Sequence, residues 1–344
     1  MAAWGKLLGS MRRKAPLLAL PLAAATILLG LASCSSGQAK RTSSSNPLAG
    51  QLFYVEPHGE AAEQAKQWRD EGRKSDASAI ERIAAQPIAT WLTGSEGVGA
   101  EVKSLTTAAN ASGRSALLVA YDIPGRDCGS FSAGGAGSTA AYKSWIEQIA
   151  SGISSRTATV ILEPDAVAQT LSGCVSKREG KERYAMLKYA VKTLKAEGHV
   201  TVYIDAGNPG WIKPVSELVG PLRKAGIAHA DGFALNVSNF YTTATTTAYG
   251  EELSKALGGT HFVIDTGRNG NGPDTNSKDA PTWCNPPGRA LGTNPTTNTG
   301  QAQIDAYLWI KQPGASDGTC RSGAPAAGAW WPEYALELAR DAGA

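Results

Sequence analysis

Short apolar runs alternate with amphipathic stretches along most of the chain. The runs are LFYV (52–55), PIATWL (87–92), ALLVAYD (116–122), ATVILEPD (158–165), VTVYIDAG (200–207), GFALNVSN (232–239), HFVIDTGRNG (261–270) and AYLWIK (306–311). Several are apolar at successive positions, which is typical of strands buried on both faces of a parallel sheet. We therefore predict a strand in each run.

The stretches between these runs carry helical patterns, in which apolar residues recur at spacings of three and four. The clearest patterns are residues 78–85, 140–153, 181–198 and 249–259. Gly152, Gly198 and Gly258 are expected to end the last three helices. Seven or eight strand–helix units favour a closed α/β barrel. A doubly wound open sheet is the alternative, but no GxGxxG follows a strand, so its dinucleotide-binding version has no support.

The first 34 residues form a separate region with an export pattern. A basic segment, residues 11–14, precedes the apolar stretch 17–32 and the small residues before Cys34. This arrangement indicates a signal peptide, and the LASC ending resembles a lipobox, in which Cys34 becomes the lipidated first residue. Simple secretion and an uncleaved anchor are the alternatives. The Ser-rich stretch 35–46 is expected to be a tether, and the folded domain is expected to span 47–344.

Charge and cysteine content narrow the class of protein. A formal net charge of +3 without a basic stripe does not favour a nucleic-acid partner. Besides Cys34 the chain has Cys128, Cys174, Cys284 and Cys320, with no CxxC pair that would indicate zinc. An even set in an exported chain favours disulfides. Three connectivities are possible, and the sequential one joins cysteines 46 and 36 residues apart.

Acids and amides stand at the ends of several predicted strands. In a parallel barrel these ends meet on one rim, where active sites are built. Each residue alone could simply start a turn or cap a helix. Together with tryptophans they favour a carbohydrate site, because aromatic faces stack on sugar rings and paired carboxyl groups cleave glycosidic bonds. No histidine falls in a metal-binding motif, so neither a metal nor a cofactor is predicted. The residues concerned are Asp122, Asp165, Asp205, Asn239 and Asp265, with Trp91, Trp211 and Trp283.

Two motifs, YDIPGRDCGSFSAGG (121–135) and VILEPDAVA (160–168), resemble the signatures of glycoside hydrolase family 6. This is a family of cellulases that act on β-1,4-glucan with inversion. The resemblance continues, in the family's order, through YIDAGNPGW, LNVSNF, VIDTGRNGNGP, WCNPPGRALG, TNTG and LWIKQPGASDG, and covers the chain from about residue 50 onward. It implies a distorted seven-stranded parallel β/α barrel (TIM-like), with the substrate cleft over the C-terminal rim.

The resemblance also implies roles for the charged residues. Asp165 is the expected general acid, which must stay protonated near neutral pH. Asp127 is expected to raise the pKa of Asp165 and is one candidate base, acting through a second water. Asp317 is the other candidate base. Arg126 is expected to orient the carboxylates, and Tyr121 to crowd the sugar at the cleavage point.

Further residues are expected to contact substrate by the same resemblance. Trp91 and Trp283 would be sugar platforms on one side of the cleavage point, with Trp211 and Asp205 on the leaving-group side. Polar contacts are expected from Asn208, Asn239 and Lys311. We also expect Cys128 to pair with Cys174, which would fix Asp127 near Asp165.

The chain departs from the family pattern at three positions. Ala315 stands where many members carry Glu, so a hydrogen bond to the sugar is expected to be missing. Asn208 replaces His and Phe240 replaces Tyr. None of the three touches the expected acid, so hydrolysis is still predicted.

These observations predict an exported, monomeric endo-β-1,4-glucanase, bound to the membrane only if Cys34 carries a lipid. The short segment between Asp165 and Cys174, eight residues, favours an open cleft and internal attack over a roofed, processive cleft. One alternative is an envelope-tethered glycan-binding protein with little or no activity. Another is an enzyme of the same mechanism that acts on a different β-glucan.

Overall fold

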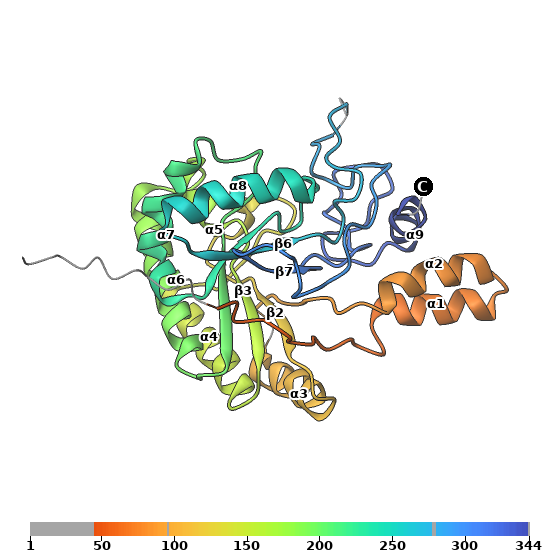
Figure 1. Cartoon of the computed structure of the whole chain (residues 1–344), viewed down its shortest axis with the longest axis horizontal. Helices are drawn as coiled ribbons and strands as arrows, with labels where there is room; N and C mark the ends of the chain where they lie inside the picture. Colours follow the sequence, from red (N-terminus) through yellow and green to blue (C-terminus); the bar gives the residue numbers. More distant parts are fainter. Residues whose placement is uncertain (1–44, 95, 277–279, 343–344) are drawn as a thin grey trace, which may run out of the picture. The chain divides into compact units, whose positions relative to one another are not determined.

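Seven short parallel strands form the centre of the fold (Figure 1). The computed structural model describes residues 45–94, 96–276 and 280–342. The strands are β1 (Thr90–Leu92), β2 (Ala116–Ala120), β3 (Ala158–Leu162), β4 (Val200–Asp205), β5 (Gly232–Leu235), β6 (His261–Asp265) and β7 (Ile304–Leu308). They pair in sequence order from β1 to β7, each pair parallel. Because a doubly wound sheet reverses its strand order, this order confirms the barrel and excludes the alternative.

The sheet closes weakly between its first and last strands. Ile88 forms a single parallel bridge with Trp309, and the Ala89 N–H donates to the Trp309 carbonyl at 3.1 Å. The predicted strand at 52–55 is wrong: only Phe53 bridges Ser115, at the start of β2. Phe53 is buried in the core inside the barrel, but residues 52–55 do not extend the sheet. The result is the distorted seven-stranded barrel that the family resemblance implies.

Helices alternate with the strands and cover the outside of the barrel. They are α1 (Glu60–Asp70), α2 (Lys74–Ala84), α3 (Val98–Ala111), α4 (Thr139–Ile153), α5 (Ala166–Leu171), α6 (Lys177–Lys195), α7 (Val219–Ala225), α8 (Thr243–Ala256) and α9 (Pro332–Asp341). Short 3-10 segments span Asp127–Gly129, Val215–Leu218 and Ile227–His229. Figure 1 shows α4, α6 and α7 along one side of the sheet.

Side chains of each strand alternate between two cores. Leu118, Val202 and Phe262 face the helices, whereas Val119 and Tyr203 point into the barrel. This alternation follows from the two-residue period of a strand. Every position of β2 and β6 is buried, which explains why the runs look apolar throughout.

One predicted helix end is wrong. Gly152 lies inside α4, which continues to Ile153. A Cβ on Gly152 would come within 2.7 Å of the Gly99 carbonyl oxygen, so this glycine allows α3 to approach α4. The prediction at Gly258 is confirmed, because this residue follows the end of α8 with a φ of 84°.

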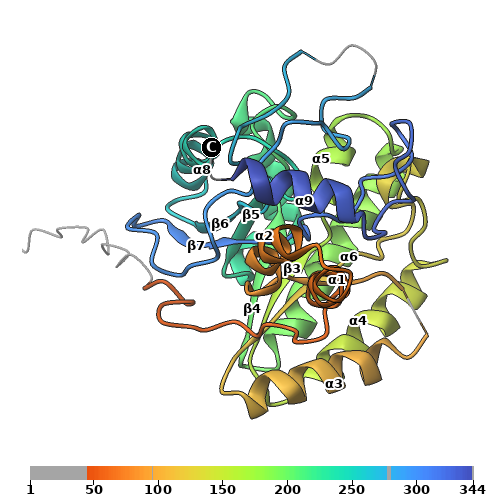
Figure 2. The ribbon, with the colours of Figure 1, turned by 90° about the vertical axis from the view of Figure 1, so that its right-hand side faces the viewer.

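The α1–α2 hairpin packs beside α9, as Figures 1 and 2 both show. A third core cluster joins them, with Trp68, Ile80, Ile83, Trp309 and Leu338 buried together. Within the described residues no helix has the length and apolarity needed to cross a membrane. The predicted signal peptide, Cys34 and all but the end of the predicted tether lie outside the described residues.

Candidate active site

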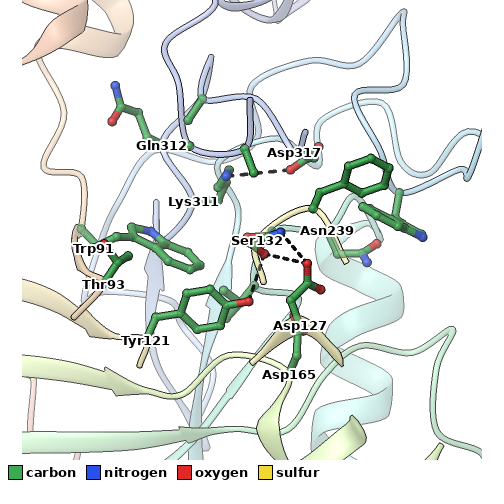
Figure 3. Close-up of a pocket in the computed structure, with 18 of the residues that line it drawn as sticks. Trp91, Thr93, Tyr121, Asp127, Ser132, Asp165, Asn239, Lys311, Gln312 and Asp317 are labelled. Atoms are coloured by element: carbon green, nitrogen blue, oxygen red, sulfur yellow. Dashed lines mark hydrogen bonds and ion pairs between the residues drawn. The ribbon is translucent and has the colours of Figure 1, made fainter. Parts of the chain in front are cut away.

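A cleft of about 1270 Å³ lies over the C-terminal ends of the strands (Figure 3). Its wall includes Trp91 in β1, Tyr121 after β2, Asp165 after β3, Asn239 after β5 and Lys311 after β7. Residues more than 200 positions apart in sequence therefore meet at one rim, where barrel enzymes carry their chemistry.

Asp165 lies at the start of α5, on a strained turn. Its φ is 71° and that of Glu163 is 50°, both in the left-handed region that L-residues rarely adopt. Burial, reinforced by the negative charge of Asp127, raises the pKa of Asp165 to about 7. The structure places no hydrogen-bond partner from the described residues on its carboxyl group. A carboxyl that is protonated near neutral pH and free to face the cleft has the properties of a general acid.

Asp127 lies on the loop after β2, across from the Asp165 turn. Its Oδ2 accepts hydrogen bonds from the Ser132 N–H at 2.7 Å and the Ser132 hydroxyl at 2.9 Å. The Ser132 hydroxyl is also 3.2 Å from the Tyr121 hydroxyl. Figure 3 shows Tyr121, Ser132 and Asp127 joined in this chain above Asp165. Burial, followed by the charge of Asp165, raises the pKa of Tyr121, so its phenol stays neutral.

A disulfide holds the Asp127 loop to the segment after the acid. Cys128 pairs with Cys174, which follows α5, and Cys284 pairs with Cys320. The sequential connectivity among the three possibilities is thus confirmed, as is the expected link from Cys128 to Cys174.

Asp317, the other candidate base, is held in a buried ion pair. Arg268 donates to its two carboxylate oxygens at 2.8 and 2.9 Å, and the Asn285 N–H donates to it at 3.0 Å. Lys311 lies 4.0 Å away. Both carboxylate oxygens of Asp317 are therefore already engaged by donors of the protein.

Arg126 contacts the backbone of its own loop. Its guanidinium donates to the Tyr121 carbonyl at 2.7 Å and to the Ser132 carbonyl at 3.0 Å. The carboxylate it pairs with is that of Asp122, at 3.4 Å, rather than Asp127 or Asp165. Arg126 therefore holds the backbone of the Asp127 loop, and its expected effect on Asp127 and Asp165 stays a prediction.

Asp205 does not line the cleft, which corrects its prediction as a sugar contact. It is 1% exposed, and its Oδ1 accepts the N–H groups of Asp165 at 2.8 Å and Gly207 at 3.1 Å. Burial, then the charge of Asp165, raises its pKa well above the usual range. Asp205 is the last residue of β4, and from this buried position it holds the backbone of Asp165.

The three predicted tryptophan platforms all line the cleft. The Trp91 indole is fixed by a hydrogen bond to the Ile310 carbonyl and packs edge-on against Tyr121, with ring centroids 5.2 Å apart. Trp283 is 41% exposed and meets Phe131, 43% exposed, with centroids 6.2 Å apart. Exposed aromatic side chains that face each other in a cleft are available for stacking on sugar rings.

The three predicted polar contacts also line the cleft, although each already makes a hydrogen bond to the protein. Asn208 accepts from the Gly210 N–H, and Asn239 accepts from the Phe240 N–H. Lys311 donates to the Ser316 carbonyl, and burial lowers its pKa. Their remaining hydrogen-bonding capacity faces the cleft.

The departures from the family pattern have different consequences. Phe240 is fully buried, and the Arg268 guanidinium lies 4.4 Å from its ring centroid, so this residue does not face substrate. Ala315 does line the cleft, beside Lys311 and Asp317.

Several cleft residues were not predicted from the sequence. Ser132 and Phe131 lie within the motif 121–135, but Ser is common in turns, so the sequence alone does not indicate a function for either residue. Gly59, Glu60 and Gln86 lie at the two ends of the α1–α2 hairpin, whose sequence pattern does not indicate a binding site. The Gln312 amide donates to the Glu60 carboxylate there at 2.9 Å. Among the described residues no group of three or more His, Cys, Asp or Glu side chains could hold a metal ion.

Comparisons with known proteins agree with this geometry. The model of the family "Glycosyl hydrolases family 6" matches residues 48–342. Endoglucanase A of Cellulomonas fimi is 45% identical over 84% of this chain, and the match spans 61% of that protein. Endoglucanase 1 of Streptomyces halstedii is 41% identical over 83% of this chain and 88% of its own length.

Solved structures include the endoglucanase Cel6 from Mycobacterium tuberculosis, in complex with methyl-cellobiosyl-4-deoxy-4-thio-β-D-cellobioside. It has 43% identity and a TM-score of 0.80, and the match covers 87% of this chain and all of that one. The chain spans less than two thirds of the length of the endoglucanases from Cellulomonas fimi and Thermobispora bispora.

Proposed function

The chain belongs to glycosyl hydrolases family 6, and from this membership we propose that it hydrolyses internal β-1,4-glucosidic bonds of cellulose or a related β-glucan, with inversion. The observation that carries the proposal is Asp165, whose carboxyl group has a pKa of about 7 and no hydrogen-bond partner among the described residues, in a cleft walled by tryptophans.

In the proposed reaction Asp165 gives its proton to the glycosidic oxygen as the bond from this oxygen to the sugar C1 breaks. A water attacks C1 from the opposite face and forms the new C–O bond. Its proton passes through a second water to Asp127, whose position Ser132 holds. The leaving sugar departs with a hydroxyl group, and C1 is inverted.

Asp127 is the better candidate base of the two. Within the described part of the chain its carboxylate accepts hydrogen bonds on one oxygen, from Ser132, and it lies in the cleft wall. Asp317 instead faces Arg268, the Asn285 N–H and Lys311. We assign Asp317 the role of keeping Lys311 in place against the substrate.

Internal attack is supported by the short connection after the acid. Only α5 and a few residues separate Asp165 from Cys174, so this segment has no length for a roof. The names of the bacterial relatives, both endoglucanases, agree with this mode of attack.

The two disulfides indicate an exported protein, because such bonds persist in oxidising compartments. We propose further that Cys34 carries a lipid and that the enzyme acts as a monomer at the cell surface. Mass spectrometry of the mature N-terminus tests the lipid: an unmodified peptide that begins elsewhere contradicts it.

The test of the enzyme proposal is reducing-sugar release from a soluble cellulose derivative. We expect activity in the wild type and a loss of at least about 100-fold in Asp165→Asn, since a general acid contributes about 100- to 10,000-fold. Asp70→Asn, an exposed position at the end of α1, is the matched control and keeps wild-type activity. A wild type no more active than Asp165→Asn on any β-glucan would refute the proposal.

A further inference from the structure

Two ionisable side chains with no part in the proposed chemistry are buried beneath the catalytic loops. Glu163 is 0% exposed and lies two residues before Asp165, on the same turn. Arg183 is 2% exposed and projects from α6. Buried groups of this kind are costly unless their hydrogen bonds are made, so their partners indicate what they do.

Glu163 holds the first half of the loop that leads to Asp127. Both of its carboxyl oxygens lie 3.1 Å from the Asp122 N–H, and Oε2 also accepts the Ile123 N–H at 3.0 Å. The turn that carries the acid is thereby tied to the residues that directly follow β2.

Arg183 holds the second half of the same loop. Its Nη2 donates to the Pro124 carbonyl at 3.2 Å and to the Gly125 carbonyl at 3.0 Å. Its Nη1 donates to Gln169 at 3.0 Å and to the Ala166 carbonyl at 3.4 Å, both in α5, the helix that starts directly after Asp165. One guanidinium therefore spans from the acid's helix to the residues just before Arg126 and Asp127.

Four successive residues, 122–125, are thus fixed from the acid's side, two through their N–H groups and two through their carbonyls. We propose that Glu163 and Arg183 are positioning residues, which together form a clamp that sets the separation of Asp127 from Asp165. This proposal rests on the proposed function above, because it assigns the clamp a role in that reaction.

The disulfide alone does not fix this separation. Cys128–Cys174 joins the far end of the loop to the segment after α5, beyond Asp127 and beyond Gln169. The clamp joins the near end, so Asp127 is held from both sides. An inverting enzyme needs its two carboxyl groups at a separation that admits water, and a displacement of about 1 Å can lower the rate about 100-fold.

Arg183 also contributes charge at the acid. Its positive charge lowers the pKa of Asp165, against the larger upward effects of burial and of Asp127. The ionisable groups that face Asp165 from the surrounding elements are Tyr121, Asp127, Arg183, Asp205 and Lys311. Positioning and charge can be separated, because lysine keeps the charge but cannot reach both pairs of acceptors.

The experiment compares Arg183→Lys, Arg183→Met and Glu163→Met with the wild-type chain on a soluble cello-oligosaccharide. We expect kcat to fall about 10- to 100-fold in each, with KM changed less than about threefold, since the sugar contacts are untouched. In Arg183→Met the alkaline limb of the kcat profile moves to higher pH, because a positive charge that lowers the pKa of Asp165 is lost. In Arg183→Lys this limb stays where it is in the wild type.

Arg156→Met is the matched control. Arg156 also bonds a backbone carbonyl, that of Gly152, and a hydroxyl, that of Thr106, but it lies between α4 and β3, at the opposite ends of the strands from the cleft. We expect wild-type kcat and pH profile from this variant. If its kcat falls as far as that of Arg183→Met, the effect is one of general destabilisation and the clamp proposal fails.

Hydrogen exchange gives a readout that does not depend on activity. In Glu163→Met, which has a side chain of similar shape but no acceptor oxygen, the Asp122 and Ile123 amides are expected to exchange at least about tenfold faster than in the wild type. Wild-type kcat in folded Arg183→Lys and Glu163→Met would overturn the proposal, as would unchanged exchange of both amides. If the wild type hydrolyses no β-glucan, the proposed function fails separately, and the exchange result still decides whether the clamp exists.

Discussion

At the scale of single residues, the protonation of Asp165 controls the proposed chemistry. Only the protonated form of Asp165 can donate a proton to the leaving oxygen, and the pKa of this group is raised to about 7 by burial and by Asp127. We therefore predict that kcat/KM is lost as the pH rises through about 7. A pH profile on a soluble cello-oligosaccharide measures this, and activity that stays constant to pH 9 would contradict the assignment.

The two candidate bases are predicted to differ in what their loss does to stability. Asp317→Asn leaves the buried Arg268 without its carboxylate, which should lower the free energy of unfolding by about 3–5 kcal/mol. Asp127→Asn should lower it by no more than about 1.5 kcal/mol, because Asn can still accept from Ser132.

Urea denaturation together with activity measurements checks this pair. We expect Asp127→Asn to be folded and inactive, whereas Asp317→Asn is destabilised. A stable, inactive Asp317→Asn and an active Asp127→Asn would reverse the assignment of the base.

Motif residues could be found from the sequence, but their environments could not. Asp165 could be found from its place at a strand end, since such acids converge in a parallel barrel, whereas Asp127 was indicated only by the resemblance of its RDC motif to the family. The burial of Asp205 depends on where β4 ends relative to the rim, and the partner of Arg126 depends on the path of its loop. Arg183 could not be found either, because a helix position read alone gives no distance to a loop some 58 residues earlier.

At the scale of elements, removal of one disulfide is expected to change mainly kcat, and removal of the other mainly KM. Each closes a loop, of 46 and 36 residues, and its removal should lower the free energy of unfolding by about 3–4 kcal/mol. Replacing Cys128 and Cys174 by Ala frees the Asp127 loop and should lower kcat. Replacing Cys284 and Cys320 frees the segment of Trp283 and should mainly raise KM.

Steady-state kinetics on both double variants, below their unfolding temperatures, measure the contrast. Equal effects on kcat and KM in the two variants would show that the disulfides act only through general stability.

The positions of the strands could be predicted from the apolar runs because both faces of the sheet are buried, and a short run that is apolar throughout is typical of such a strand. The wrong strand prediction at 52–55 has a physical cause. An apolar run indicates burial rather than strand pairing, and Phe53 is buried although this segment forms only a single bridge to Ser115. The weak closure between β1 and β7 depends on tertiary packing, which no local pattern encodes.

At the scale of the whole molecule, several buried carboxyl groups make stability depend on pH. Burial raises the pKa of Glu163 to about 8, of Asp165 to about 7 and of Asp122 to about 6. A group with a higher pKa in the folded state binds more protons when folded, so acidification favours folding. The free energy of unfolding should therefore rise as the pH falls from about 8 to about 5.

Urea denaturation at pH 8 and pH 5 measures this slope. We expect the protein to be more stable at pH 5 by several kcal/mol, at least about 3, since one pKa unit corresponds to about 1.4 kcal/mol and the three groups act in the same direction. Glu163→Gln, which removes one contributing group, should reduce the difference. Greater stability at pH 8 would contradict the protonation of these carboxyl groups.

The central claim is that Asp165 and Asp127 act together on a β-1,4-glucan with inversion. Time-resolved proton NMR of the products from a soluble cello-oligosaccharide tests it most directly. We predict that the new reducing end appears first as the α-anomer, from an internal bond, and then mutarotates. A new reducing end that appears first as the β-anomer would contradict the account.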